Sequence, residues 1–87
     1  MNNIFDELIN IVGILITRGY KIETYTLLDI KHERKDREII LISNDKFKLY
    51  YYENKLHLET TYSNTKVDDD FIEEATFLNA LLKDFNS

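Results

Sequence analysis

Five acidic side chains lie within seven consecutive positions near the end of the chain, where they form the densest group of acidic residues in the sequence. They are Asp68, Asp69, Asp70, Glu73 and Glu74. Carboxylates gathered in this way can imitate a run of phosphates and occupy a cationic surface that would otherwise hold nucleic acid. The alternative is that they cap and solvate the start of a helix, although a single side chain is enough for a cap.

The surplus negative charge of the chain is local. Residues 67–87 hold six acidic residues and one basic residue, whereas residues 1–66 hold ten of each, so the net charge of −5 arises from the last part. A local field of this sign attracts cationic surfaces and repels nucleic acid. The sequence therefore predicts a basic protein, rather than a nucleic acid, as the partner.

Catalytic and ligand-binding motifs are not found in the sequence. There is no Cys, and the two Gly residues form neither a phosphate-binding loop nor a nucleophile turn. His32 and His57 have no second ligand at a recognised metal-site spacing, and Asp68–Asp70 lacks the glycine and distal glutamate of a calcium loop. We therefore expect no enzyme activity, no catalytic residue, no cofactor and no metal.

Size and composition favour one folded unit. The 87 residues are 44% hydrophobic and 13% aromatic, which predicts a single α+β domain over residues 1–87 rather than disorder. The apolar stretch Leu8–Ile16 is too short to span a bilayer, and Asp6 and Glu7 precede it where a secretory signal would be basic. We expect no membrane association and a cytoplasmic location, with which the lack of Cys is compatible.

Hydrophobic periodicity predicts a helix followed by a strand. Apolar residues recur at three- and four-residue steps from Ile4 to Arg18, with Asn3 as the N-cap and Gly19 as the stop. From Tyr20 to Ile30 the apolar period becomes two, which is typical of a long strand.

Three further strands are expected, joined by the two-residue turns Asn44-Asp45 and Glu53-Asn54. Their predicted ranges are Glu38–Ser43, Lys46–Tyr52 and Lys55 to about Thr61. A polar link, Ser63–Lys66, then leads to a second amphipathic helix that begins at the aspartates and ends near Phe85. The predicted fold class is α+β: helix, four-stranded antiparallel meander, helix, in a two-layer sandwich with both helices on one sheet face.

The predicted register leaves a second sheet face that is rich in aromatic and aliphatic side chains. These are Tyr25, Leu27, Ile39, Leu41, Tyr50, Tyr52 and His57, beside Lys46, Lys48, Lys55 and Glu59. An uncovered apolar face favours contact with a partner, with Tyr25, Tyr50 and Tyr52 as its anchors. The alternative is that these side chains pair across strands and stabilise the sheet, with the lysine stems covering them.

The overall plan is similar to that of a family of small proteins. The N-terminal helix beginning MNNIFDELI, the length, the acidity and the following antiparallel strands resemble phage-encoded type II anti-CRISPR inhibitors. The resemblance implies a non-enzymatic inhibitor from a phage or mobile element, acting in the host cytoplasm as a DNA mimic. It implies a larger basic host protein as the partner, such as a CRISPR effector nuclease. The balanced charge of residues 1–66 departs from the most acidic mimics.

Two other functions remain open from the sequence. The order of helix, strands and helix is also that of double-stranded RNA-binding domains, and Lys35, Arg37, Lys46 and Lys48 would then contact the nucleic acid. The chain can also be a structural protein that forms a homodimer or larger oligomer by pairing its outer sheet faces.

Overall fold

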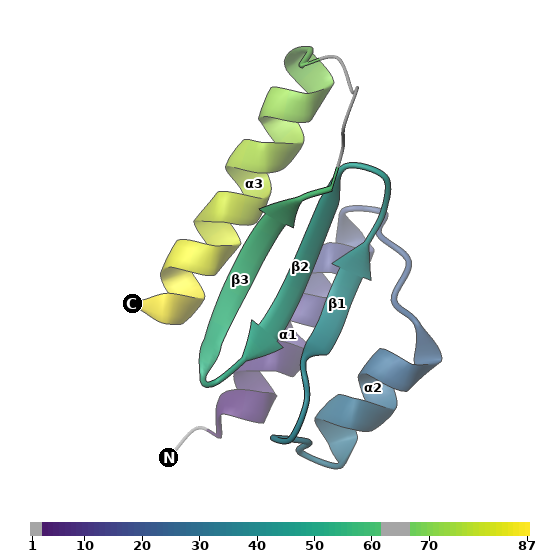
Figure 1. Ribbon diagram of the computed structural model, residues 1–87, viewed down its shortest axis with the longest axis vertical. Helices are drawn as coiled ribbons and strands as arrows, with labels where there is room; N and C mark the ends of the chain where they lie inside the picture. Colours follow the sequence, from purple (N-terminus) through teal and green to yellow (C-terminus); the bar gives the residue numbers. More distant parts are fainter. Residues whose placement is uncertain (1–2, 62–66) are drawn as a thin grey trace.

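The computed structural model describes residues 3–61 and 67–87, which form three helices and one antiparallel sheet of three strands (Figure 1). In chain order the elements are α1 Ile4–Thr17, α2 Thr24–Lys31, β1 Ile39–Ser43, β2 Phe47–Tyr52, β3 Lys55–Thr60 and α3 Asp69–Asn86. The strands are ordered β1-β2-β3. The α+β class is confirmed, whereas the predicted four-stranded meander is wrong. The predicted link Ser63–Lys66 lies outside the described residues.

Both ends of α1 follow the signals in the sequence. Asn3 Oδ1 accepts a hydrogen bond from the Phe5 N–H at 2.9 Å and caps the helix. Gly19 adopts a φ of 95° and donates its N–H to the Ile16 carbonyl at 2.9 Å. Only glycine adopts this conformation without strain, so it ends the helix.

The predicted strand from Tyr20 to Ile30 is wrong, because its second part forms α2. Thr26 and Ile30 lie four residues apart, and both are buried on one side of this short helix. The helix ends with Glu33 at a φ of 50°, whose N–H donates to the Ile30 carbonyl at 3.0 Å. Glycine usually holds that position, so the sequence carries no stop signal there. Leu28, which the predicted two-residue period places on the same side as Ile30, is 47% exposed.

The second hairpin forms as predicted. Glu53 and Asn54 are its two central residues, with φ values of 52° and 70°. Positive φ at both positions is the requirement of a type I′ turn, whose twist matches that of the strands. The expected register follows, with Tyr50 opposite His57 and Tyr51 opposite Leu56.

The register of the first hairpin was predicted wrongly because its turn lies one residue later. Asn44 Oδ1 accepts from the N–H groups of Lys46 and Phe47 at 2.8 and 2.7 Å, and the Asn44 N–H donates to the Phe47 carbonyl. Asp45 and Lys46 are therefore the central residues, and Asn44 closes the turn with its side chain.

A β-bulge in β1 adds a second shift. The pairing changes between Ile40, opposite Tyr50, and Ile42, opposite Leu49. A bulge places an extra residue on one strand and redirects the side chains around it. Consequently Ile39 and Leu41, which were expected on the outer face, are 0% and 1% exposed.

Helices α1 and α3 pack against the same sheet face. Phe5 of α1 and Phe85 of α3 both contact the ring of Tyr51, with centroid distances of 5.7 and 6.1 Å. Phe71 of α3 stacks on Phe47 at 4.9 Å. The buried apolar core consists of Phe5, Leu8, Ile11, Val12, Leu15, Ile30, Ile39, Leu41, Ile42, Phe47, Leu49, Tyr51, Leu56, Phe71, Leu78 and Leu81.

Both outer strands of the sheet are covered at their free edges. Helix α2 lies beside β1 (Figure 1), and the Thr26 hydroxyl donates to the Ile40 carbonyl at 2.5 Å. Helix α3 lies beside β3, where the Asn86 amide accepts from the N–H and donates to the carbonyl of Leu56, each at 2.9 Å. Such contacts satisfy edge groups that would otherwise pair with another chain.

Candidate partner-binding site

The acidic cluster forms the start of α3. Asp68 is the N-cap, and its Oδ1 accepts from the Phe71 N–H at 2.9 Å. Asp69 and Asp70 follow in the first helical turn and are exposed, as is Asp68. The positive end of the helix dipole stabilises acidic side chains at these positions. One aspartate thus serves as the cap, and the other two present their carboxylates to solvent.

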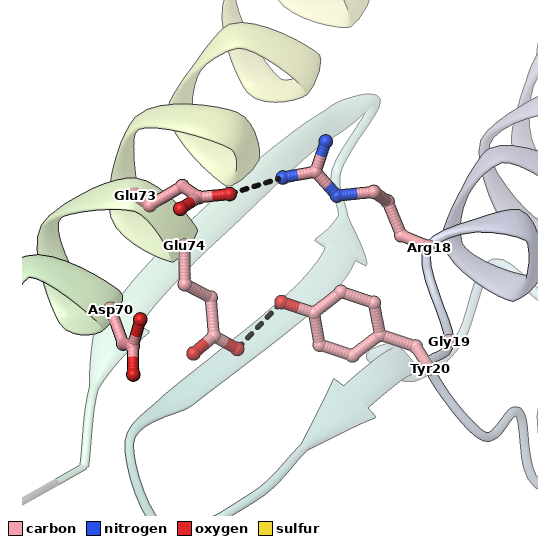
Figure 2. Close-up of a pocket in the computed structure, with 6 residues that line it drawn as sticks. All are labelled: Arg18, Gly19, Tyr20, Asp70, Glu73 and Glu74. Carbon is pink, nitrogen blue, oxygen red and sulfur yellow. Dashed lines mark hydrogen bonds and ion pairs between the residues drawn. The ribbon is translucent and has the colours of Figure 1, made fainter.

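The end of α1 meets this helix start (Figure 2). Glu73 Oε1 lies 3.6 Å from an Arg18 guanidinium nitrogen, and the Tyr20 hydroxyl donates to Glu74 Oε2 at 2.6 Å. These residues, with Gly19 and Asp70, line a pocket of about 240 Å³. Arg18 also lies over the ring of Phe77, 4.2 Å from its centroid. The turn after α1 therefore contacts two of the five carboxylates, and it holds Glu74 by a hydrogen bond.

The charges at this end of the molecule are only partly balanced. The side chains of Arg18 and Glu73 are 46% and 74% exposed, and an ion pair at that exposure contributes little because water screens it. The hydrogen-bond partner of Glu74 is the uncharged hydroxyl of Tyr20, which contributes no positive charge. Among residues 3–61 and 67–87, no basic group forms an ion pair with Asp69 or Asp70. The start of α3 is therefore a negative surface.

Tyr20 gives this contact a measurable pH dependence. Partial burial, followed by the hydrogen bond to Glu74, raises the pKa of the Tyr20 phenol above its usual value. The pKa of this phenol is about 10 in the unfolded chain and higher in the folded protein. Its contribution to the free energy of unfolding is therefore complete below about pH 10 and is lost as the pH rises through the folded pKa.

We expect the difference in free energy of unfolding between wild type and Tyr20→Phe to be constant from about pH 6 to 9 and to decline above about pH 10. Urea unfolding of both proteins at several pH values measures it; a difference that stays constant up to about pH 12 contradicts the contact.

Tyr50 lies on the outer sheet face, but its contacts are internal. Its ring stacks on that of His57 with centroids 5.0 Å apart, and Lys48 Nζ lies 4.6 Å from its centroid. Its hydroxyl donates to Glu59 at 3.0 Å. These are cross-strand contacts of the kind that stabilise a sheet. They favour the sheet-stabilising interpretation of Tyr50 over its use as a free anchor.

The three predicted tyrosines do not share one surface. Tyr50 and Tyr52 are on β2, and Tyr52 is 38% exposed. Tyr25, predicted on the same sheet face, lies on α2 instead, 51% exposed and close to the edge of β1. Helix α3, with the acidic cluster, lies along the opposite edge beside β3 (Figure 1). A single flat contact with all eight predicted residues is therefore not available.

One of the four basic side chains proposed for nucleic-acid contact, Lys48, and a neighbour of the others, Arg34, form ion pairs within the protein. Lys48 forms an ion pair with Glu38 at 3.3 Å. In the loop before β1, Arg34 donates two hydrogen bonds to Asp36 at 2.9 and 2.7 Å. The Arg34 guanidinium lowers the pKa of Asp36 to about 2. Arg34 and Asp36 therefore balance each other, whereas Lys35 and Arg37 of the same loop are exposed and form no ion pair within residues 3–61 and 67–87.

Arg18 and Tyr20 were not identified as site residues from the sequence. They lie more than fifty positions before Glu73 and Glu74, which they contact, so only the packing of α1 beside α3 brings them there. Within the described part of the chain, no three His, Asp or Glu side chains gather as a metal-binding group. Over the same residues, no helix combines the length and apolar character needed to cross a bilayer.

Comparison with known proteins finds no matching family model, no matching curated sequence and no matching solved structure.

Proposed function

We propose that the protein is a non-enzymatic binding module that inhibits a host defence nuclease by docking the start of α3 onto its basic, nucleic-acid-binding surface. This function is anti-CRISPR-like, and the source would be a phage or another mobile element. The observation that supports it best is the pair Asp69 and Asp70, which are exposed, adjacent, and without an ion-pair partner among the described residues.

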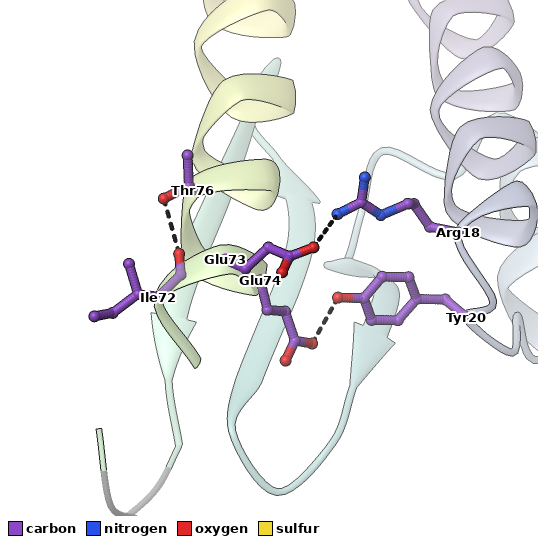
Figure 3. Close-up of polar contacts among 6 residues, drawn as sticks. All are labelled: Arg18, Tyr20, Ile72, Glu73, Glu74 and Thr76. Carbon is purple, nitrogen blue, oxygen red and sulfur yellow. Dashed lines mark hydrogen bonds and ion pairs between the residues drawn. The ribbon is translucent and has the colours of Figure 1, made fainter. Parts of the chain in front are cut away.

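The surrounding contacts suit an electrostatic docking surface. Asp68 is held by its capping bond and Glu74 by the hydrogen bond from Tyr20, while Glu73 lies near Arg18 (Figure 3). Carboxylates that are held in place before binding lose less conformational entropy on association. Complementary charge mainly accelerates association and suppresses wrong partners, and it acts over about 10 Å at moderate ionic strength.

Charge reversal at the two unpaired aspartates tests the proposal. The variant Asp69→Lys with Asp70→Lys replaces attraction by repulsion and is expected to weaken binding to a guide-loaded type II CRISPR effector by about tenfold, mostly through slower association. Binding kinetics on the immobilised effector measure both rates. Circular dichroism of the variant establishes that it is folded.

A matched control carries the same change in net charge elsewhere. Asp45→Lys with Asp84→Lys alters two exposed residues, one in the first hairpin turn and one near the end of α3. The dissociation constant of this control should lie within about twofold of the wild-type value. Any change within that range measures the general effect of net charge. Equal weakening by both variants would mean that the charge of the whole protein, rather than the start of α3, governs binding.

A further inference from the structure

A cavity that the proposed function does not use lies where the loop before β1 meets the hairpin between β2 and β3. Both lie at the end of the sheet away from the start of α3 (Figure 1). The cavity has a volume of about 170 Å³ and is lined by Lys35, Arg37, Tyr51, Glu53 and Asn54. Because a water molecule takes up about 30 Å³ in the liquid, there is room for roughly five non-hydrogen atoms.

The loop before β1 brings two positive charges to this cavity. Lys35 and Arg37 are exposed and form no ion pair within the two described stretches of the chain. The acidic side chains of this loop already have other partners, which are Asn3 for Glu33, Arg34 for Asp36 and Lys48 for Glu38. The two cations are therefore left without a hydrogen-bonded carboxylate from their own loop.

Two hydrogen-bonding side chains of the sheet line the same cavity. The Tyr51 hydroxyl donates to Asn54 Oδ1 at 3.2 Å, and the Tyr51 ring is buried in contact with Phe5 and Phe85. The Asn54 amide nitrogen donates to no other described residue, so its N–H groups are available to a ligand. The bond to Tyr51 orients this amide before binding, which reduces the entropy lost when a ligand is held.

We propose that this cavity binds the phosphate group of a small ligand, either inorganic phosphate or a phosphomonoester, with Lys35, Arg37 and Asn54 as its donors. Guanidinium and ammonium groups form charge-assisted hydrogen bonds with phosphate oxygens, and an amide N–H adds a directed bond. A phosphate group, with its five non-hydrogen atoms, also matches the size of the cavity. The proposal does not depend on the function proposed above.

The charges around the cavity favour a small ligand over a nucleic acid. The net charge of −5 repels a polyanion, whereas a single phosphate group meets the local field of the two cations. Nucleic-acid binding also needs cations for several successive phosphates. The neighbouring cations Arg34 and Lys48 are already in ion pairs. The free cations therefore suit one phosphate group.

Titration with inorganic phosphate, and separately with phenyl phosphate, at constant ionic strength tests the proposal. The Asn54 side-chain amide signals in NMR spectra should shift with a dissociation constant of about 1 mM or lower for the better of the two probes. The tighter probe then identifies the source of the phosphate. Lys35→Gln with Arg37→Gln should raise that constant at least about tenfold.

The matched control is Lys21→Gln with Lys83→Gln, which removes two exposed positive charges elsewhere. Its dissociation constant should lie within about twofold of the wild-type value. The absence of an Asn54 shift at about tenfold higher concentration of either probe, or equal weakening by the two double variants, overturns the proposal.

A third variant should change the affinity in the opposite direction. Glu53 is the one acidic side chain among the five that line the cavity, and it repels an anion there. Glu53→Gln should lower the dissociation constant at least about twofold, whereas Asp45→Asn, in the other hairpin turn, should leave it unchanged. Weaker binding by Glu53→Gln contradicts the site. An RNA duplex that shifts the same Asn54 signals at lower phosphate concentration also contradicts it, because these cations then serve nucleic acid.

Discussion

Replacing Phe47 with alanine is expected to lower the free energy of unfolding by about 3–5 kcal/mol. Phe47 is 0% exposed at the start of β2, and its ring stacks on Phe71 at 4.9 Å. The substitution removes the contact that joins the sheet to the first turn of α3, and it leaves a cavity that the surrounding core fills only in part. Because small domains are stable by about 5–15 kcal/mol, this is a large fraction of the total. Urea unfolding followed by circular dichroism measures it.

Tyr52→Ala is the matched control for this variant. It truncates an aromatic side chain on the same strand, but Tyr52 is 38% exposed and at the other end of β2. We expect a loss below about 1 kcal/mol. Similar losses for the two variants would show that Phe47 is not a central core residue and would contradict the packing of α3 against the sheet.

Thr26→Val is expected to cost about 1–3 kcal/mol although it barely changes the shape of the side chain. Thr26 is 0% exposed on α2, and its hydroxyl donates to the Ile40 carbonyl at 2.5 Å. Valine fills the same space but leaves that carbonyl at the β1 edge without this donor. Urea unfolding measures the loss, and Thr26→Ser, which keeps the hydroxyl, should recover much of it.

Thr76→Val applies the same chemical change at an exposed position. The Thr76 hydroxyl donates to the Ile72 carbonyl at 2.8 Å within α3, where water can replace it (Figure 3). The free energy of unfolding should change by less than about 0.5 kcal/mol. If Thr26→Val is equally neutral, α2 is not anchored to β1 in the way described.

The long helices and the second hairpin could be predicted because their signals are local. Asn3 and Gly19 mark the ends of α1, Asp68 caps α3, and Glu53-Asn54 suits a two-residue turn. Each feature depends on residues a few positions apart. The sequence therefore specifies these elements without reference to the rest of the fold.

Helix α2 was predicted as a strand because its eight residues satisfy both periods. Thr26 and Ile30 are compatible with alternation and with a helical spacing of four. Its N-cap, Glu23, makes no side-chain capping bond, and its end is set by Glu33 in a conformation usually reserved for glycine. Packing against α1 and β1 decides the outcome, and packing is not visible in a short window of sequence.

The bulge in β1 limited the prediction of the sheet faces in the same way. One extra residue near Leu41 moves Ile39 and Leu41 into the core, so an arithmetic register assigns them to the wrong face. At the candidate site, the acidic cluster was evident from composition. The contacts of this cluster with Arg18 and Tyr20 could not be predicted, because these contacts join distant parts of the chain.

The most direct test of the proposed function is the inhibition of DNA cleavage by a guide-loaded type II CRISPR effector. We predict that the wild-type protein and the Asp45→Lys, Asp84→Lys control inhibit at similar concentrations, whereas Asp69→Lys with Asp70→Lys requires about tenfold more. Inhibition by the Asp69, Asp70 variant at the wild-type concentration would contradict docking through the start of α3.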